Sequence, residues 1–195
     1  MAPKSPSGSE GLRRAVFLDR DGVLNEPVVR DRVPHSPASL DELVVTRDTD
    51  QACGAFKRAG LLLIMVTNQP DLARRTAARE TVDAINDQLR RHLGLDAVFM
   101  CPHDDADSCA CRKPLPGMLL DAASRWHVDL PGSVMVGDRW RDVEAGRSAG
   151  CATVLIRRDY DERPATGADQ VVASLGEALP WILRRTASGT AGGAR

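Results

Sequence analysis

The chain has 195 residues, of which 43% are hydrophobic, and this is enough for one domain with a buried core. Its 26 basic and 27 acidic side chains give a formal net charge of −1, and aromatic residues make up only 4%. This balance argues against a nucleic-acid partner and against attraction to an anionic membrane, and no apolar run is long enough for a transmembrane helix.

The two ends of the chain are polar and rich in small residues, so we expect residues 1–14 and 186–195 to be disordered. The folded domain is then expected over residues 15–185. The N-terminal segment lacks the hydrophobic stretch of a secretory signal. Three of the five cysteines lie within residues 101–111, which is poor spacing for a disulfide framework. These features predict a reduced, cytoplasmic protein.

Between the ends, short apolar runs alternate with helical patterns. Strands are predicted over residues 15–19, 61–67, 97–101, 133–137, 152–156 and 170–173. Helices are predicted over residues 49–59, 76–93, 116–126, 140–149 and 174–185. Continuously apolar strands that alternate with helices indicate an α/β fold, a three-layer sandwich with a central parallel sheet. Ligands of such sheets bind at the carboxyl ends of the strands.

Polar side chains follow the first two predicted strands. Asp19 and Asp21 flank an arginine where the first strand stops, and Gly22 allows a sharp turn directly after them. The second strand ends in Thr67, which is followed by two amide side chains. Each pattern alone has an ordinary interpretation, an acidic turn or a polar strand exit. Together they place carboxylates, a hydroxyl and amides at one edge of the sheet.

Two further motifs lie later in the chain. Lys113 follows an arginine directly after a cysteine cluster, and an ammonium group there is suited to a phosphate. Asp138 follows the fourth predicted strand, and Asp142 lies four residues further on, at the start of a helix. The alternatives are a solvated basic pair and acidic residues favoured by the helix dipole.

The cysteine cluster has the spacing of a metal site. Cys101 and His103 are followed, after five residues, by Cys109 and Cys111. Three thiolates and one imidazole are a ligand set for tetrahedral Zn²⁺ with no open position, which predicts a structural site. Unligated thiols in a loop are the alternative. The ion would make the loop that carries Lys113 rigid.

These motifs occur in an order that resembles the haloacid dehalogenase superfamily of phosphotransferases: Asp-x-Asp-Gly, a strand-terminal threonine, a lysine, then Gly-Asp-x-x-x-Asp. The resemblance covers residues 15–157. The zinc motif and the Arg-Lys-Pro sequence after it are similar to the zinc-containing capless branch of that superfamily. The resemblance therefore implies a Rossmann-like, capless domain with a small zinc-binding loop.

The resemblance also implies roles for individual residues. Asp19 would be the nucleophile that forms an aspartyl-phosphate, and Asp21 the general acid and base. Thr67 and Lys113 would hold the phosphoryl oxygens. Mg²⁺ would bind the carboxylates of Asp19 and Asp138 and the backbone carbonyl of Asp21. The expected substrate contacts are Arg20, Asn25, Asn68, Gln69, Arg112 and Arg139.

The branch includes phosphatases of D-glycero-D-manno-heptose 1,7-bisphosphate and of histidinol phosphate. Residues 113–118 are similar to the former, which predicts removal of the 7-phosphate; histidinol phosphate or another small sugar phosphate is the alternative. A catalytically silent binding or regulatory module on the same fold is an alternative of another class. Residues 25–35 and 70–75 depart from the branch's pattern, so phosphatase activity is better supported than the substrate.

The predicted partner is a small phosphorylated metabolite, and the chain is expected to be a monomer. Asp142 is expected to orient Lys113 or a metal-bound water.

Overall fold

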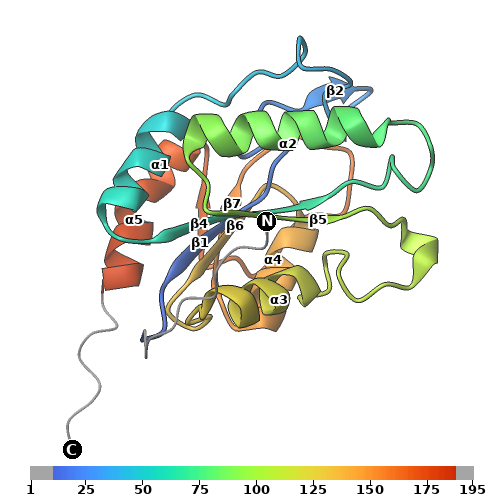
Figure 1. The fold of residues 1–195 in the computed structure, drawn as a ribbon. Helices are drawn as coiled ribbons and strands as arrows, with labels where there is room; N and C mark the ends of the chain where they lie inside the picture. Colours follow the sequence, from blue (N-terminus) through green and yellow to red (C-terminus); the bar gives the residue numbers. More distant parts are fainter. Residues whose placement is uncertain (1–10, 188–195) are drawn as a thin grey trace, which may run out of the picture.

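The computed structural model describes residues 11–187. Its centre is a sheet that lies between layers of helices (Figure 1). The sheet is parallel and has six strands in the order β5-β4-β1-β6-β7-β8. The strands are β1 (Ala15–Leu18), β4 (Leu62–Asn68), β5 (Ala97–Cys101), β6 (Val134–Gly137), β7 (Ala152–Ile156) and β8 (Gln170–Val172). Each corresponds to a strand that the sequence predicts, so the parallel α/β prediction is confirmed.

Helices cover both faces of this sheet, as Figure 1 shows. The helices are α1 (Thr49–Arg58), α2 (Arg79–Leu93) and α5 (Leu175–Ala187) on one face, and α3 (Gly117–Trp126) and α4 (Trp140–Ala149) on the other. Successive side chains of a strand point to opposite faces. Val16 and Leu18 of β1 therefore pack with α1, α2 and α5, whereas Ala15 and Phe17 pack with α3 and α4. Because both faces are buried, the strand is apolar throughout.

An antiparallel hairpin, β2 (Val28–Arg30) and β3 (Val33–His35), is an addition that the sequence analysis did not predict. Its strands have three residues each and are largely exposed, so no apolar periodicity marks them. The turn between them places Asp31 and Arg32 at φ angles of 50° and 62°. Residues 33–36 line a cleft at the edge of the main sheet.

The described part of the chain extends slightly beyond the expected domain of residues 15–185. Arg13 forms a parallel bridge with Val128, and α5 continues to Ala187. The other residues expected to be disordered, 1–10 and 188–195, lie outside the described residues. Within residues 11–187, no helix combines the length and apolar character that crossing a membrane requires.

The carboxyl ends of four neighbouring strands meet at one edge of the sheet. β1 lies between β4 and β6, and β5 flanks β4. Three residues at or just after these ends, Asp19, Asn68 and Asp138, therefore line one cleft. From β1 the chain continues through β4 and β5 on one side of the sheet, and then crosses over to β6 on the other side of β1. Ligands of open α/β sheets bind in the crevice at such a point.

Candidate active site

Three buried carboxylates and one buried ammonium group form the floor of the cleft. Asp19 follows β1, Asp138 follows β6, and Asp142 lies in the first turn of α4; one oxygen from each lies within 4.8 Å of the others. Nζ of Lys113 is 2.7 Å from Oδ1 of Asp19 and 2.6 Å from Oδ1 of Asp142. With all four groups ionised, three negative charges and one positive charge leave a net charge of −2. The predicted role of Asp142 in orienting Lys113 agrees with this contact.

The donor set of this floor fits a hard divalent cation. Oδ1 of Asp138 is buried without a hydrogen-bond partner among residues 11–187, while Oδ2 accepts a hydrogen bond from the Tyr160 hydroxyl at 2.6 Å. Carboxylate and carbonyl oxygens are the ligands that Mg²⁺ prefers, and a +2 ion would cancel the net charge. Gly22 has a φ of 87°, and a Cβ there would lie 1.8 Å from Oδ2 of Asp138. A side chain at that position would therefore occupy the space of the carboxylate.

Burial sets the protonation of these groups. Desolvation raises the pKa of Asp19 to about 6, with Lys113 opposing the shift and Asp142 adding to it. Burial also raises the pKa of Asp138 well above its ordinary value, and the two neighbouring carboxylates raise it further. Burial opposes the charge of Lys113, but Asp142 and Asp19 outweigh it and raise the lysine pKa. Lys113 therefore stays protonated, and further positive charge nearby would stabilise the ionised form of the carboxylates around it.

Asp21 lies beside this floor and is surrounded by donors. It accepts hydrogen bonds from Arg20 at 3.0 Å, Asn25 at 3.0 Å, Ser36 at 2.8 Å and Gln69 at 3.1 Å. Burial opposes ionisation of this carboxyl, yet Arg20, Asn25 and Ser36 hold its pKa below the ordinary value. Asp21 is therefore a carboxylate in the free protein at neutral pH.

Three of the residues that donate hydrogen bonds to Asp21 do not have the role that the sequence analysis predicted. Arg20, Asn25 and Gln69 were predicted to contact substrate, but their exposed fractions are 0%, 0% and 1%. Arg20 also donates to Asn86 at 2.9 Å and to Gln69 at 3.0 Å. Because their side chains are withdrawn from solvent and bound to Asp21 or to one another, the structure makes them supports of Asp21 instead.

Asn68 holds the loop that delivers Lys113. Its amide donates to the backbone carbonyl of Lys113 at 3.0 Å and accepts from the backbone N–H of the same residue at 3.1 Å. Nζ of Lys113 also donates to the carbonyl of Val66 at 2.9 Å. Asn68 was expected to contact substrate, and it lines the cleft. Its side-chain amide is already hydrogen-bonded to the backbone of Lys113. Thr67 is buried beside it, and its hydroxyl accepts from Gln69 at 2.9 Å.

The predicted zinc ligands converge at the end of β5. Sγ of Cys101 is 3.3 Å from Sγ of Cys111, 3.6 Å from Sγ of Cys109 and 3.5 Å from Nδ1 of His103. Sγ of Cys111 is 3.5 Å from Cys109 and 3.3 Å from His103. Ligands at Zn–S and Zn–N lengths of about 2.0–2.3 Å around a tetrahedral ion lie about 3.3–3.8 Å apart, so this set fits Zn²⁺.

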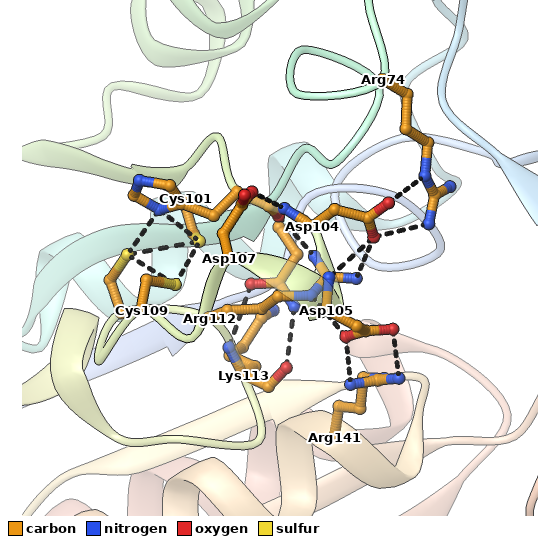
Figure 2. Close-up of polar contacts among 12 residues, drawn as sticks. Arg74, Cys101, Asp104, Asp105, Asp107, Cys109, Arg112, Lys113 and Arg141 are labelled. Atoms are coloured by element: carbon orange, nitrogen blue, oxygen red, sulfur yellow. Dashed lines mark hydrogen bonds and ion pairs between the residues drawn. The ribbon is translucent and has the colours of Figure 1, made fainter.

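Arginines and aspartates alternate across the mouth of the cleft, as Figure 2 shows. Arg74 donates to both oxygens of Asp104 at 2.7 Å. Arg112 donates to Asp105 at 2.7 Å and lies 4.0 Å from Asp104. Arg141 pairs with both oxygens of Asp105 at 3.2 Å. This chain of ion pairs links the segment after β4, the zinc loop and the first turn of α4.

Arg112 and Arg139 both line the cleft, where substrate contacts were predicted. Both guanidinium groups already have partners. Arg112 donates to the backbone carbonyl of His103 at 3.2 Å as well as to Asp105. Nε of Arg139 lies 2.9 Å and 3.0 Å from the two carboxylate oxygens of Glu162. An anion at either arginine must therefore compete with a carboxylate of the protein.

Sequence reasoning missed several residues of the site. Ser36 and Tyr160 lie in irregular segments, and nothing in their local sequence predicts contacts with Asp21 and Asp138. Arg141 could have been predicted as a residue of the site, because it lies within the same Gly-Asp-Arg-Trp-Arg-Asp sequence as Asp138. The one available signal for Tyr160 was that it is the only tyrosine of the chain.

Comparison with known proteins agrees with this geometry. A family model described as HAD-hydrolase-like matches residues 110–178. The chain is 42% identical over 149 residues to a D-glycero-beta-D-manno-heptose-1,7-bisphosphate 7-phosphatase of Bordetella bronchiseptica, with 74% of this chain and 80% of the relative covered. The chain belongs to the haloacid dehalogenase-like phosphatases. Another relative of this phosphatase, an enzyme of the same name from Escherichia coli K12, is 33% identical over 187 residues, which cover 88% of this chain and 94% of the relative.

A solved structure is similar to this haloacid dehalogenase-like phosphatase over most of its length. It is the D,D-heptose 1,7-bisphosphate phosphatase of B. bronchiseptica complexed with magnesium and phosphate. The TM-score is 0.76 at 36% identity, with 88% of this chain and 98% of that chain covered. The predicted family, fold and enzyme class, a phosphoric monoester hydrolase, are therefore confirmed.

Proposed function

We propose that this phosphatase removes the 7-phosphate of D-glycero-D-manno-heptose 1,7-bisphosphate. The observation that carries the proposal is the cleft floor, where Lys113 holds Oδ1 of Asp19 at 2.7 Å and leaves Oδ2 for attack on phosphorus. The names of the B. bronchiseptica and E. coli relatives support the choice of substrate.

The proposed reaction has two steps. In the first, Oδ2 of Asp19 attacks phosphorus, the bond from phosphorus to the sugar oxygen breaks, and Asp21 gives that oxygen a proton. In the second, water attacks the phosphorus of the aspartyl-phosphate, gives its proton to Asp21, and releases inorganic phosphate and Asp19. Lys113 and Thr67 hold the equatorial phosphoryl oxygens, where negative charge is spread in the transition state.

The surroundings of Asp21 decide how it carries the proton. Its donors keep the free carboxyl ionised, which suits the base role in the second step. A dianionic phosphoryl group next to Asp21 opposes that ionisation, so substrate binding raises its proton affinity. Asp21 therefore takes up its proton with the substrate and delivers it in the first step.

Both metal sites contribute to the proposal. Bound Mg²⁺ would offset the repulsion between the anionic nucleophile and the phosphoryl group. The carboxylates of Asp19 and Asp138 and the backbone carbonyl of Asp21 are the ligands we propose for it. The ligands proposed for Zn²⁺ are Cys101, His103, Cys109 and Cys111. That site lies in the loop that delivers Lys113, and its role is to hold the loop.

Arg112 and Arg139 are the residues that we propose for the second phosphate of the substrate. A guanidinium group binds phosphate oxygens in a bidentate manner, so phosphate can replace a carboxylate partner without loss of geometry. Asp105 and Glu162 occupy the two arginines in the free protein. A second phosphate would therefore exchange with these carboxylates.

Phosphate release with Mg²⁺ on a substrate panel tests the proposal. The panel contains heptose 1,7-bisphosphate in both anomers, histidinol phosphate, and common sugar and nucleotide monophosphates. We expect a clear preference for the bisphosphate, no turnover by Asp19→Asn, and full turnover by the control Asp83→Asn on the exposed face of α2. A preference for histidinol phosphate or a sugar monophosphate would overturn the substrate, and an active Asp19→Asn would overturn the nucleophile.

We also propose a cytoplasmic location, on the basis of the cysteine spacing and the N-terminal segment, and no nucleic-acid or membrane partner, on the basis of charge and aromatic content. We propose a monomer as the default state. Light scattering during size-exclusion chromatography tests the monomer, and a mass of two chains would contradict it.

A further inference from the structure

Residues 157–163 follow β7 and contact the turns that follow β1 and β6; we refer to this segment as the strap. One side of the strap is attached to the β1 turn and to the hairpin. Arg158 donates to the carbonyl of Gly22 through Nη2 at 2.8 Å, and the backbone N–H of Asp161 donates to the carbonyl of Arg32 at 3.0 Å. The strap therefore has a fixed position over the motif that contains Asp19 and Asp21.

The other side of the strap is attached to the start of α4. Glu162 pairs with Arg139, and Arg163 donates to Glu144 at 2.7 Å. The guanidinium group of Arg163 also lies over the ring of Trp140, 4.5 Å from its centroid. Contacts on both sides hold the residues between them in one place.

Tyr160 lies between these two sets of contacts and reaches the cleft floor. Its hydroxyl donates to Oδ2 of Asp138 at 2.6 Å. The close approach depends on Gly22, because a Cβ at that position would lie 3.0 Å from the tyrosine hydroxyl and 1.8 Å from Oδ2. A glycine, a tyrosine and a carboxylate are thus packed against one another at the end of β6.

The hydrogen bond makes the two oxygens of Asp138 unequal. Oδ2 has a donor, whereas Oδ1 is buried and has no partner among the described residues. A buried carboxylate oxygen without a partner is costly, and the other carboxylates of the floor cannot supply a proton while they are ionised. A cation bound at the floor would satisfy Oδ1 without breaking the bond to the tyrosine.

We propose that Tyr160 is a positioning residue that fixes the Asp138 carboxylate so that Oδ1 alone is presented to the divalent cation. The inference rests on the proposed function and adds to it a residue from outside the four sequence motifs. Partners that orient metal ligands in this way typically change metal affinity or activity by about 10–100-fold when they are removed.

Tyr160→Phe tests the proposal because it removes the hydroxyl and keeps the ring. Mn²⁺, which takes the same oxygen ligands as Mg²⁺, is titrated into the zinc-loaded full chain without substrate, and free Mn²⁺ is measured by electron paramagnetic resonance. We expect Tyr160→Phe to bind Mn²⁺ about 10–100-fold more weakly than wild type. Turnover that returns to within a few-fold of wild type at saturating Mg²⁺ would support positioning, because only the metal requirement then changes.

Arg163→Gln is the matched control. It breaks the strap's contacts with Glu144 and Trp140 but does not touch Asp138, and we expect it to bind Mn²⁺ as wild type does. Equal weakening in the two variants would mean that general packing of the strap, and not the hydroxyl, determines affinity. Wild-type affinity in Tyr160→Phe would also overturn the proposal.

A second measurement keeps the tyrosine hydroxyl and so does not depend on the folding of a variant that lacks it. Because Tyr160 is the only tyrosine, incorporation of 3-fluorotyrosine gives one ¹⁹F resonance. Addition of Mg²⁺ should shift this resonance, and an unchanged frequency would overturn the proposal. The Mn²⁺ affinity and the ¹⁹F frequency are both measured without turnover. If the substrate panel showed no preference for the bisphosphate, the proposed function would be overturned, and these two measurements would still decide the role of Tyr160.

Discussion

Replacement of Asp138 by asparagine is expected to stabilise the Mg²⁺-free protein and to abolish its thermal response to Mg²⁺. The asparagine side chain has nearly the same shape and can still accept the hydrogen bond from Tyr160. It lacks the negative charge that faces Asp19 and Asp142. Lys113 compensates only one of the three negative charges of this cluster.

The structure gives the size of the effect. Two unit charges 4.8 Å apart interact with about 3 kcal/mol at an effective dielectric constant of about 20. Asp138 faces two such carboxylates, while Lys113 and partial protonation relieve part of the repulsion. We therefore expect the free energy of unfolding to rise by about 1–3 kcal/mol at pH 8, or about 2–12 °C in Tm for a domain of this size.

The effect should depend on pH in a defined direction. The folded-state pKa of Asp138 is raised, so between its ordinary and its raised value the native protein binds more protons than the unfolded chain. The stability of the Mg²⁺-free wild type therefore falls as pH rises through that window. Because Asp138→Asn lacks this group, the difference in Tm between variant and wild type should be small near pH 5 and larger at pH 8.

Thermal unfolding of zinc-loaded protein, followed by circular dichroism with and without Mg²⁺, measures these differences. Chelators are avoided because they would also remove zinc. Asp83→Asn, on the exposed face of α2, is the control and should leave the Mg²⁺ response unchanged. A lower Tm of Asp138→Asn without Mg²⁺ at pH 8, or a wild-type response of this variant to Mg²⁺, would refute the reasoning.

Three further variants test other parts of the site. Cys109→Ser should reduce zinc from about one ion per chain to none by mass spectrometry of metals, and should cost about 3–4 kcal/mol of stability, since a tightly bound ion stabilises the folded state by this much; retained zinc would contradict the ligand set. Asn68→Ala should lower kcat about 10–100-fold without changing Mn²⁺ affinity, because it frees the peptide of Lys113; unchanged kcat would show that the pairing is dispensable. Gly22→Ala should weaken Mn²⁺ binding, because its Cβ would overlap Asp138. Its φ of 87° alone should lower the free energy of unfolding, measured in urea, by about 1–2 kcal/mol. Wild-type values of both the Mn²⁺ affinity and the stability would contradict the close approach.

The parts of the site that sequence predicted share a physical reason. Asp19, Thr67 and Asp138 lie at ends of buried parallel strands, and such strands are recognisable because both faces are apolar. In a parallel sheet the carboxyl ends of neighbouring strands lie at the same edge, so the strand assignments alone predict that these residues lie close together. The zinc cluster could also be predicted, because its ligands are close in sequence, from the end of β5 to the loop that follows it.

The residues that sequence reasoning misjudged depend on tertiary contacts. Arg20 lies between two functional aspartates and looked like a substrate contact, but the fold buries it completely against Asn86 of α2. Ser36 reaches Asp21 only because of a hairpin with short, exposed strands. Tyr160 reaches Asp138 through a segment without regular structure. Local sequence contains no periodic signal for such contacts, so they could not be predicted from it.

The alternating ion pairs at the mouth of the cleft bear on how fast an anionic substrate is captured. Arg74, Arg112 and Arg141 share Asp104 and Asp105, so much of their positive potential is cancelled a short distance from the protein. Long-range attraction then contributes little to the encounter, and the association rate should vary only weakly with ionic strength. Selection among anions takes place instead after contact, when a ligand exchanges with the carboxylates already bound to these arginines.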